Sequence, residues 1–372
     1  MEVGHLYVHV PFCRTKCPYC DFYSTTGKVE PECYLNLLKE ELKLKKLRVK
    51  PKTIYFGGGT PSLMPPSFFE HIISLFPEAE EITVEVNPDD VNHEYLKGLK
   101  SAGVNRISLG IQTFDDSLLK ILKRRHTGTK GIKSIETAIS IFDNVSIDLI
   151  FGIPGQDEKS MEKDLKTLMK FPLKHVSTYA LTIYEKTPFH RLFKEKKYAL
   201  PSEETFSKYY SLIVEKLSTG GFYQYEISNF SKLQFECKHN LAYWDMKNYL
   251  GIGPSAASLL ANKYQKNVDN YFAYKNAISS GKVIYKEEVN LSREEVFKIK
   301  LAMGLRKTNG VNLKVEEEKV VRNSIEKSPF LQNLLNSRIL ILEKRKLKLN
   351  PEFLFVSSYL ISRIGEEIIF PA

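Results

Sequence analysis

The sequence predicts an α/β fold in which parallel strands alternate with helices, followed by a smaller, mostly helical region. Short runs rich in β-branched and aromatic residues alternate with longer segments of helical hydrophobic spacing through the first half of the chain. A glycine-rich or polar turn lies at or near the end of each of the first five runs, and the rhythm changes after about residue 200. These observations predict a sheet whose strands end at one edge.

The expected strands cover residues 6–10, 53–56, 82–86, 106–109, 145–150 and 175–181. The expected helices cover residues 32–47, 67–75, 94–102, 116–123, 131–142 and 160–169. Each helix returns the chain to the same end of the sheet, which makes the strands parallel. Six such units fit an incomplete (βα)6 barrel of the TIM type, and a doubly wound open sheet is the alternative. In either fold the turns PFC, GGGTP, EVNP, GIQTF and GIPG fall at the active face.

The second half of the chain has a different pattern. A helix over residues 202–219 leads to the aromatic stretch GFYQYEISNF and then to a GIGPSAAS loop. From about residue 292 the pattern is a helix, short helices, two short strands in ILILEKRKLKLN and a helix over 353–364, which resembles a winged-helix domain. We therefore expect a core barrel in residues 1–200, a distinct region in 201–285 and a C-terminal winged-helix-like domain in 286–372.

Composition and charge exclude several classes of function. The chain is 42% hydrophobic and 26% charged, and no stretch approaches the roughly 18 apolar residues of a membrane span. The first residues, MEVGHLYVHVPF, do not read as a signal peptide, so we expect a cytoplasmic protein. The net charge of +10 comes from basic residues scattered over amphipathic segments, without the basic stripe that nucleic acid binding requires. Attraction to acidic lipid or to propionate-bearing ligands stays open.

Three of the five cysteines form a C-x3-C-x2-C motif in PFCRTKCPYCDF, at Cys13, Cys17 and Cys20. An odd number of cysteines in a reducing compartment argues against a disulfide framework. Three thiolates can hold three irons of a [4Fe–4S] cubane and leave the fourth iron open to the amino and carboxylate groups of a methionine derivative. Zinc would need a fourth ligand and usually has paired two-residue spacing. Cys33 is expected to be a small helical side chain, whereas Cys237, close to His239, is structural or joins it at a metal.

Eight strings resemble the oxygen-independent coproporphyrinogen oxidase superfamily of radical-SAM proteins. They occur in order between about Tyr7 and Leu259: YVHVPFCRTKCPYCDF, FGGGTPSLM, EVNPDD, NRISLGIQTF, DLIFGIPGQ, YQYEISNF, HNLAYW and GIGPSAAS. The resemblance implies the incomplete barrel, a [4Fe–4S] cluster and S-adenosylmethionine (SAM). In the decarboxylating oxidases a further cysteine follows the third one closely, and a longer N-terminal extension is present. Here Asp21 and Phe22 follow Cys20, and HNLAYW matches the HNxxYW string of HemW-type heme chaperones.

The resemblance also implies roles for individual residues. Tyr7 and the backbone of Tyr19 would lie beside the methionine end of the cofactor, and Ala180 and Ala257 around its adenine. A glycine-rich turn lets backbone groups approach the cofactor closely; carboxylates accept hydrogen bonds from ribose hydroxyls, and a guanidinium grips a carboxylate through two bonds. The positions that match are Gly58, Gly59 and Thr60 for the turn, and Glu85, Gln112, Arg124 and Asp148 for the ribose, carboxylate and neighbouring groups. Without the resemblance, Asp148 reads as a polar strand end and Arg124 as a helix-surface residue.

His239 is the candidate axial ligand of a heme iron, with Tyr243 and Trp244 covering the porphyrin face. A histidine beside aromatic residues is more often structural, so this role depends on the resemblance. One position departs from the family: Tyr184 stands where a glutamate is usual, and Glu185 is displaced by one residue.

The resulting hypothesis is a chaperone that binds heme and transfers it to acceptor haemoproteins, respiratory enzymes among them. The alternative is an oxygen-independent oxidase that decarboxylates coproporphyrinogen III to protoporphyrinogen IX by radical chemistry. Radical-driven opening of the heme ring and a purely structural iron–sulfur protein are further readings. A homodimer and a peripheral contact with membranes stay open.

Overall fold

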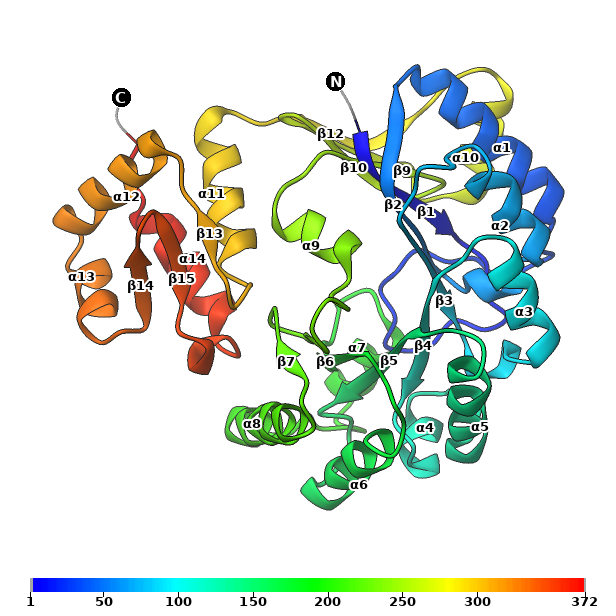
Figure 1. The fold of residues 1–372 in the computed structure, drawn as a ribbon, viewed down its shortest axis with the longest axis horizontal. Helices are drawn as coiled ribbons and strands as arrows, with labels where there is room; N and C mark the ends of the chain where they lie inside the picture. Colours follow the sequence, from blue (N-terminus) through cyan, green and yellow to red (C-terminus); the bar gives the residue numbers. More distant parts are fainter. Residues whose placement is uncertain (1–2, 371–372) are drawn as a thin grey trace.

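The computed structural model describes residues 3–370, and its first half is the expected α/β fold (Figure 1). Six strands pair in parallel in chain order: β1 (Val3–Val10), β2 (Val49–Gly58), β3 (Glu81–Val86), β4 (Arg106–Gln112), β5 (Asn144–Phe151) and β6 (His175–Ala180). The helices between them are α1 (Pro31–Lys45), α2 (Pro66–Ile73), α3 (His93–Ser101), α4 (Asp116–Ile121), α5 (Gly128–Ile139) and α6 (Glu158–Leu168). Short 3-10 helices cover Pro61–Leu63 and Pro88–Asp90. Every strand and helix expected in this half is present.

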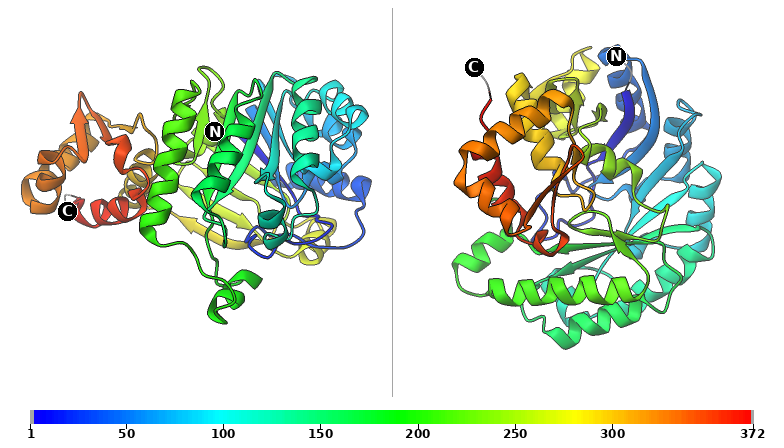
Figure 2. Two further views of the ribbon diagram at one scale, coloured as in Figure 1. Left: turned by 90° about the horizontal axis from the view of Figure 1, so that it is seen from below. Right: turned by 60° about the vertical axis from the view of Figure 1, so that its left-hand side comes forward.

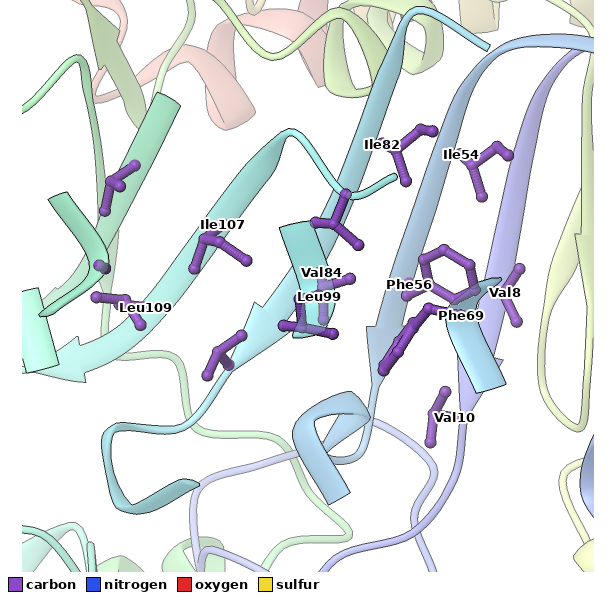
Figure 3. Close-up of a cluster of buried hydrophobic side chains, with 14 of the residues drawn as sticks. Val8, Val10, Ile54, Phe56, Phe69, Ile82, Val84, Leu99, Ile107 and Leu109 are labelled. Carbon is purple, nitrogen blue, oxygen red and sulfur yellow. The ribbon is translucent and has the colours of Figure 1, made fainter. Parts of the chain in front are cut away.

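Alternation along the strands separates an apolar outer face from a polar inner face. The outward side chains form one buried core with the helices, as Figure 3 shows for Val8, Val10, Ile54, Phe56, Ile82, Val84, Ile107 and Leu109 beside Phe69 of α2 and Leu99 of α3. The residues between them are polar and face the inside of the sheet. Burial of the outer set stabilises the sheet by removing apolar area from water, while the inner set leaves a hydrophilic interior.

The sheet continues beyond both edges of the expected barrel. Its order is β12-β11-β10-β9-β1-β2-β3-β4-β5-β6-β8-β7. The added strands are β7 (Tyr223–Gln224), β8 (Asn229–Ser231), β9 (Tyr249–Ile252), β10 (Ala257–Leu260), β11 (Lys263–Asn267) and β12 (Tyr285–Asn290). GIGPSAAS, expected as a loop, contains the end of β9 and the start of β10. Its central turn holds Gly253 and Ser255 at positive φ, so glycine and small residues there serve a tight connection between two strands.

Further helices follow β6 before the C-terminal region. The helices that periodicity did not indicate are α7 (Pro188–Lys194), α9 (Lys238–Trp244) and α10 (Tyr271–Ser279), and the expected helix after residue 200 is α8 (Glu203–Thr219). In Figure 1, α9 lies between the sheet and the C-terminal region. In the part of the chain that the structure describes, no helix combines the length and apolarity needed to cross a membrane.

The C-terminal region has a buried core of its own. It consists of α11 (Arg293–Gly304), β13 (Val311–Asn312), α12 (Val315–Lys327), α13 (Pro329–Asn336), β14 (Leu340–Glu343), β15 (Lys346–Leu349), the 3-10 helix Pro351–Phe353 and α14 (Ser357–Glu367). The strands form an antiparallel sheet in the order β13-β15-β14. Figure 2 shows this region at one end of the molecule, beside α8, where the ring of Phe355 lies 4.9 Å from that of Tyr210. The expected boundaries near residues 200 and 286 stay predictions.

A buried carboxylate joins α1 to the strands added beside β1. Glu41 accepts hydrogen bonds from Asn267 Nδ2 (2.6 Å), the Gly253 amide (2.7 Å) and the Tyr274 hydroxyl (2.7 Å). It also forms an ion pair with Lys45 Nζ at 3.3 Å, and both side chains are almost completely buried. The carboxylate therefore fixes the β9–β10 turn and β11 against α1.

We expect Glu41→Gln to lower the free energy of unfolding by about 3 kcal/mol, because it leaves the Lys45 ammonium buried without its counter-charge. Denaturant unfolding of the full chain measures the loss. Glu40→Gln is the matched control, since its exposed pair with Lys43 should contribute less than about 1 kcal/mol. Equal effects of the two substitutions would show that the buried network does not hold these elements together.

Candidate functional site

A cavity of about 690 Å³ begins at the carboxyl ends of the strands and reaches the polar interior of the sheet. The cysteine loop after β1 and the inward residues of β2 to β6 form most of its wall. Its remaining wall comes from Tyr210 of α8, Ile227 and Ser228 before β8, Asn240 of α9, and Phe355 and Ser358 of the C-terminal region. The cavity therefore needs all three expected regions of the chain for its walls.

The three motif cysteines line one end of this cavity. Their loop is closed by backbone hydrogen bonds from Cys13 to Thr25 (3.0 Å) and from Cys20 to Cys17 (3.2 Å). Two donors already point at sulfur: Thr60 Oγ1 lies 3.4 Å from Cys13 Sγ, and Arg124 Nη1 lies 3.8 Å from Cys17 Sγ. Such donors stabilise thiolates and tune iron–sulfur clusters.

The residues at this end fit an iron–sulfur cluster. The three thiols line the same end of the cavity, and hydrogen-bond donors lie beside them. The expected ligand set consists of these thiols alone and includes no carboxylate. No three His, Cys, Asp or Glu side chains within residues 3–370 converge on a single-ion site; a cubane holds its cysteines at separate corners. Burial raises the pKa of the Cys20 thiol to about 11, opposed by the Phe22 amide, so a cluster held there would require this thiol to lose its proton.

The glycine-rich turn after β2 is required by close backbone packing. Gly58 has φ +113°, and a Cβ there would lie 2.6 Å from the His9 ring. A Cβ on Gly59 would lie 2.8 Å from the Phe12 carbonyl oxygen. The glycines therefore bring the end of β2 against the start of the cysteine loop, and this contact sets Thr60 beside Cys13.

Two half-buried carboxylates face the middle of the cavity. Glu85 on β3 accepts a hydrogen bond from the Tyr55 hydroxyl (2.9 Å), and both oxygens of Asp148 on β5 lie 3.0 Å from Ser108 Oγ. Burial, with a further contribution from the Asp148 charge, raises the pKa of Glu85 to about 7. Burial also raises the pKa of Asp148 above its usual range. Both groups can accept hydrogen bonds from ligand hydroxyls once ionised.

A second network joins Arg124 to the strands. Arg124 Nη2 donates to Asn87 Oδ1 (2.6 Å) and to the Gly110 carbonyl (2.9 Å), and Asn87 Nδ2 donates to Thr60 Oγ1 (3.3 Å). Gln112, at the end of β4 beside a register shift, has φ +67°, a conformation that non-glycine residues seldom adopt outside functional or turn positions. Both side chains line the cavity near the cysteines.

His239 lies behind the cavity wall. Its side chain is 1% exposed, its Nδ1 is 2.7 Å from Thr53 Oγ1 and its Nε2 is 2.8 Å from the Tyr243 hydroxyl. Burial, followed by nearby His5 and Arg106, lowers the pKa of His239 to about 3, so the imidazole is neutral. Both ring nitrogens are thus engaged, and an iron at either would have to displace a hydrogen bond. The role of His239 as a heme ligand stays a prediction.

The structure brings most of the predicted site residues to one cavity. Those that line it are Cys13, Cys17, Cys20, Tyr19, Gly58, Gly59, Thr60, Glu85, Gln112, Arg124, Asp148 and Ala180. Tyr7 lies behind this wall, with its hydroxyl 3.1 Å from His9 Nδ1. Ala257 pairs with Lys266 in the sheet, away from the cavity lining. Tyr184 lines the cavity and the neighbouring Glu185 does not.

Several lining residues were not singled out from the sequence. Phe151, Tyr210 and Phe355 form an apolar aromatic wall, and their spacing along the chain gave no signal because they come from distant elements. Arg106 also lines the cavity. The remaining cysteines have packing roles: Cys33 is partly buried against the core, and the buried Cys237 thiol lies 3.7 Å from a Glu81 carboxylate oxygen.

Comparison with known proteins places these features in a family context. A model of the radical SAM superfamily matches residues 7–168. The chain is 36% identical to the heme chaperone HemW of Bacillus subtilis (strain 168), over 85% of this chain and 87% of that protein. It is 36% identical to the heme chaperone HemW of Lactococcus lactis, over 92% of each. Among solved structures, coproporphyrinogen III oxidase (HemN) from Escherichia coli, a radical SAM enzyme, superposes with a TM-score of 0.81 at 20% identity and covers 99% of this chain and 90% of its own.

We expect Cys13→Ala, Cys17→Ala and Cys20→Ala each to abolish most iron binding after anaerobic reconstitution, because each removes one of three thiolate ligands. Iron and sulfide content and the visible absorption of the protein measure the loss. Cys33→Ala and Cys237→Ala are matched controls that should retain both. Iron and sulfide content that stays at the wild-type level in any of the three motif variants would contradict the assignment.

Proposed function

Because the chain belongs to the HemW family within the radical SAM superfamily, we propose that it is a heme chaperone, which binds heme and transfers it to acceptor haemoproteins. The similarity to curated proteins named as heme chaperones, which extends over most of both chains, carries this proposal. Respiratory haemoproteins in the cytoplasm or at its membrane are the proposed acceptors. The likeness to the oxidase structure concerns the fold, since its identity is low.

We propose that Cys13, Cys17 and Cys20 hold a [4Fe–4S] cluster and that SAM binds beside it. When bound, the two groups supply one-electron cleavage of a sulfonium carbon–sulfur bond. Arg124, already held by Asn87, would orient the SAM carboxylate. Glu85 and Asp148 would accept hydrogen bonds from its ribose, in places where Tyr55 and Ser108 fix their carboxylates.

Heme would occupy the part of the cavity away from the cysteines. Phe151, Tyr210 and Phe355 offer flat apolar surfaces there, and pockets of this size bury most of a ligand of several hundred daltons. Heme would then lie in the same cavity as the proposed cofactor, so that binding of SAM at one end could change the affinity for heme at the other end.

His239 remains the proposed axial ligand. It would bind iron when the hydrogen bond between His239 Nε2 and the Tyr243 hydroxyl is broken. The Tyr243 hydroxyl competes with iron for this nitrogen at 2.8 Å. We therefore expect three results from an absorbance titration with hemin: stoichiometric uptake by the wild type, loss of uptake in His239→Ala, and uptake strengthened up to about tenfold in Tyr243→Phe, since one competing hydrogen bond is removed.

The outcomes separate the ligand from the function. Heme uptake that persists in His239→Ala would be compatible with the chaperone function but would show that another residue is the axial ligand. A reconstituted wild type that takes up no heme would overturn the proposed function. An anaerobic assay with coproporphyrinogen III tests the alternative, because formation of protoporphyrinogen would identify an oxidase.

The pKa of Glu85 near 7 predicts a pH dependence of SAM binding. A carboxyl whose pKa is raised stays protonated below that value, and only its ionised form accepts two ribose hydrogen bonds. Affinity should therefore rise about tenfold from about pH 6 to about pH 8. Calorimetry on reconstituted protein measures the rise, which Glu85→Gln should flatten and the exposed Glu94→Gln should not. A flat wild-type profile would show that Glu85 does not contact the cofactor.

A further inference from the structure

Arg106 is a buried cation on the inner face of the sheet. It is the first residue of β4, its side chain is 2% exposed, and it lines the cavity at the floor, beyond the level of the cysteines. The guanidinium stays charged at any physiological pH. A buried charge is costly unless a counter-charge or several hydrogen-bond acceptors accompany it.

The structure supplies Arg106 with little direct compensation. Its Nε atom has no hydrogen-bond partner in the described chain, and the guanidinium forms no ion pair there. Glu81 is the carboxylate whose charge acts on it most. However, the two oxygens of Glu81 accept hydrogen bonds from the amides of His239 (2.9 Å) and Lys238 (3.0 Å) at the start of α9.

The other two acids near Arg106 are also held elsewhere. Glu85 accepts from the Tyr55 hydroxyl, and Asp148 accepts from Ser108 Oγ. Arg106 lowers the pKa of both carboxyls by its charge, yet neither pairs with it directly. The floor of the cavity therefore presents a guanidinium with free capacity to bind an anion.

The other cations of the cavity lining are not equivalent. Arg124 is engaged by Asn87 and Gly110 beside the cysteines, and Lys16 is exposed in the cysteine loop, where water screens its charge. A planar, monovalent carboxylate matches the guanidinium fork, and burial strengthens such a pair.

We propose that Arg106 binds a carboxylate of the ligand in this cavity and, resting on the proposed function, that this carboxylate is a propionate of heme. The propionate would give the Arg106 guanidinium a directly paired carboxylate, which the described chain does not provide. It would also place one edge of the porphyrin at the floor, with the ring toward the aromatic wall of Phe151, Tyr210 and Phe355.

The test compares hemin with its dimethyl ester, in which both propionates are neutral, on anaerobically reconstituted full-length protein. Wild type should bind hemin about tenfold or more tightly than the ester, as expected for a buried charge-assisted pair. Arg106→Gln should lose this preference by weakening hemin and leaving the ester unchanged. Arg106→Lys should keep part of the preference, and Lys43→Gln, a control at an exposed cation of α1 outside the cavity, should keep all of it.

Several outcomes overturn the proposal. Equal affinities of the wild type for hemin and for the ester would overturn it. This comparison needs no variant, so it holds even if Arg106→Gln fails to fold. Equal weakening of both ligands in a folded Arg106→Gln would assign the residue a structural role. Weaker SAM binding in that variant, with an unchanged preference for hemin, would assign the carboxylate to the cofactor. A wild type that binds neither porphyrin overturns the proposed function as well, whereas binding without preference overturns this inference alone.

Discussion

The alternation of apolar and polar residues along β1 to β6 is the constraint on which the rest of the structure depends. Closed eight-stranded barrels fill their interior with branched apolar side chains. Here the outward residues, such as Val84 and Leu109, form the core beneath the helices, and the inward residues, such as Glu85 and Asp148, are polar. A six-stranded crescent with a polar lining encloses space for a hydrophilic cofactor, but it leaves an open side that other segments must cover.

The cover is built from the second half of the chain, and it is tied to the sheet by specific polar contacts. Glu81, at the start of β3, receives two amides from the first turn of α9 and so fixes this helix at the open side. The Phe355 ring packs on Tyr210 and brings the C-terminal region to the cavity wall. Residues 7–168, which match the superfamily model, thus contain the three cysteines and most of the residues proposed for the cofactor, while the wall proposed for heme comes mainly from outside them.

Periodicity and spacing predicted the first half of the fold well because each element there is long enough to show its pattern. The added strands were missed because β7 to β10 have two to four residues each, too few for alternation, and because the glycines of GIGPSAAS suggested a loop. The cysteines were found from spacing alone. Arg106 had a signal, since Ile107 and Leu109 alternate with it and place it on the polar face. The guanidinium of Arg106 lacks a paired carboxylate because Glu81, Glu85 and Asp148 form hydrogen bonds with other groups. Only the folded structure shows these hydrogen bonds.

The residues proposed to hold the cofactor and the residue proposed to hold heme differ in how ready they are to bind. At the cysteine end, Thr60, Asn87 and Arg124 already hold one another and the sulfurs, so a resident cofactor would meet a preorganised site. Behind the cavity wall, the proposed heme ligand, His239, is held by hydrogen bonds to Thr53 and Tyr243. Heme bound at His239 would have to compete with these bonds, and its apparent affinity would be reduced by the fraction of time that the imidazole is free. This arrangement would suit the proposed chaperone, because the same hydrogen bonds that oppose heme loading would favour its release to an acceptor.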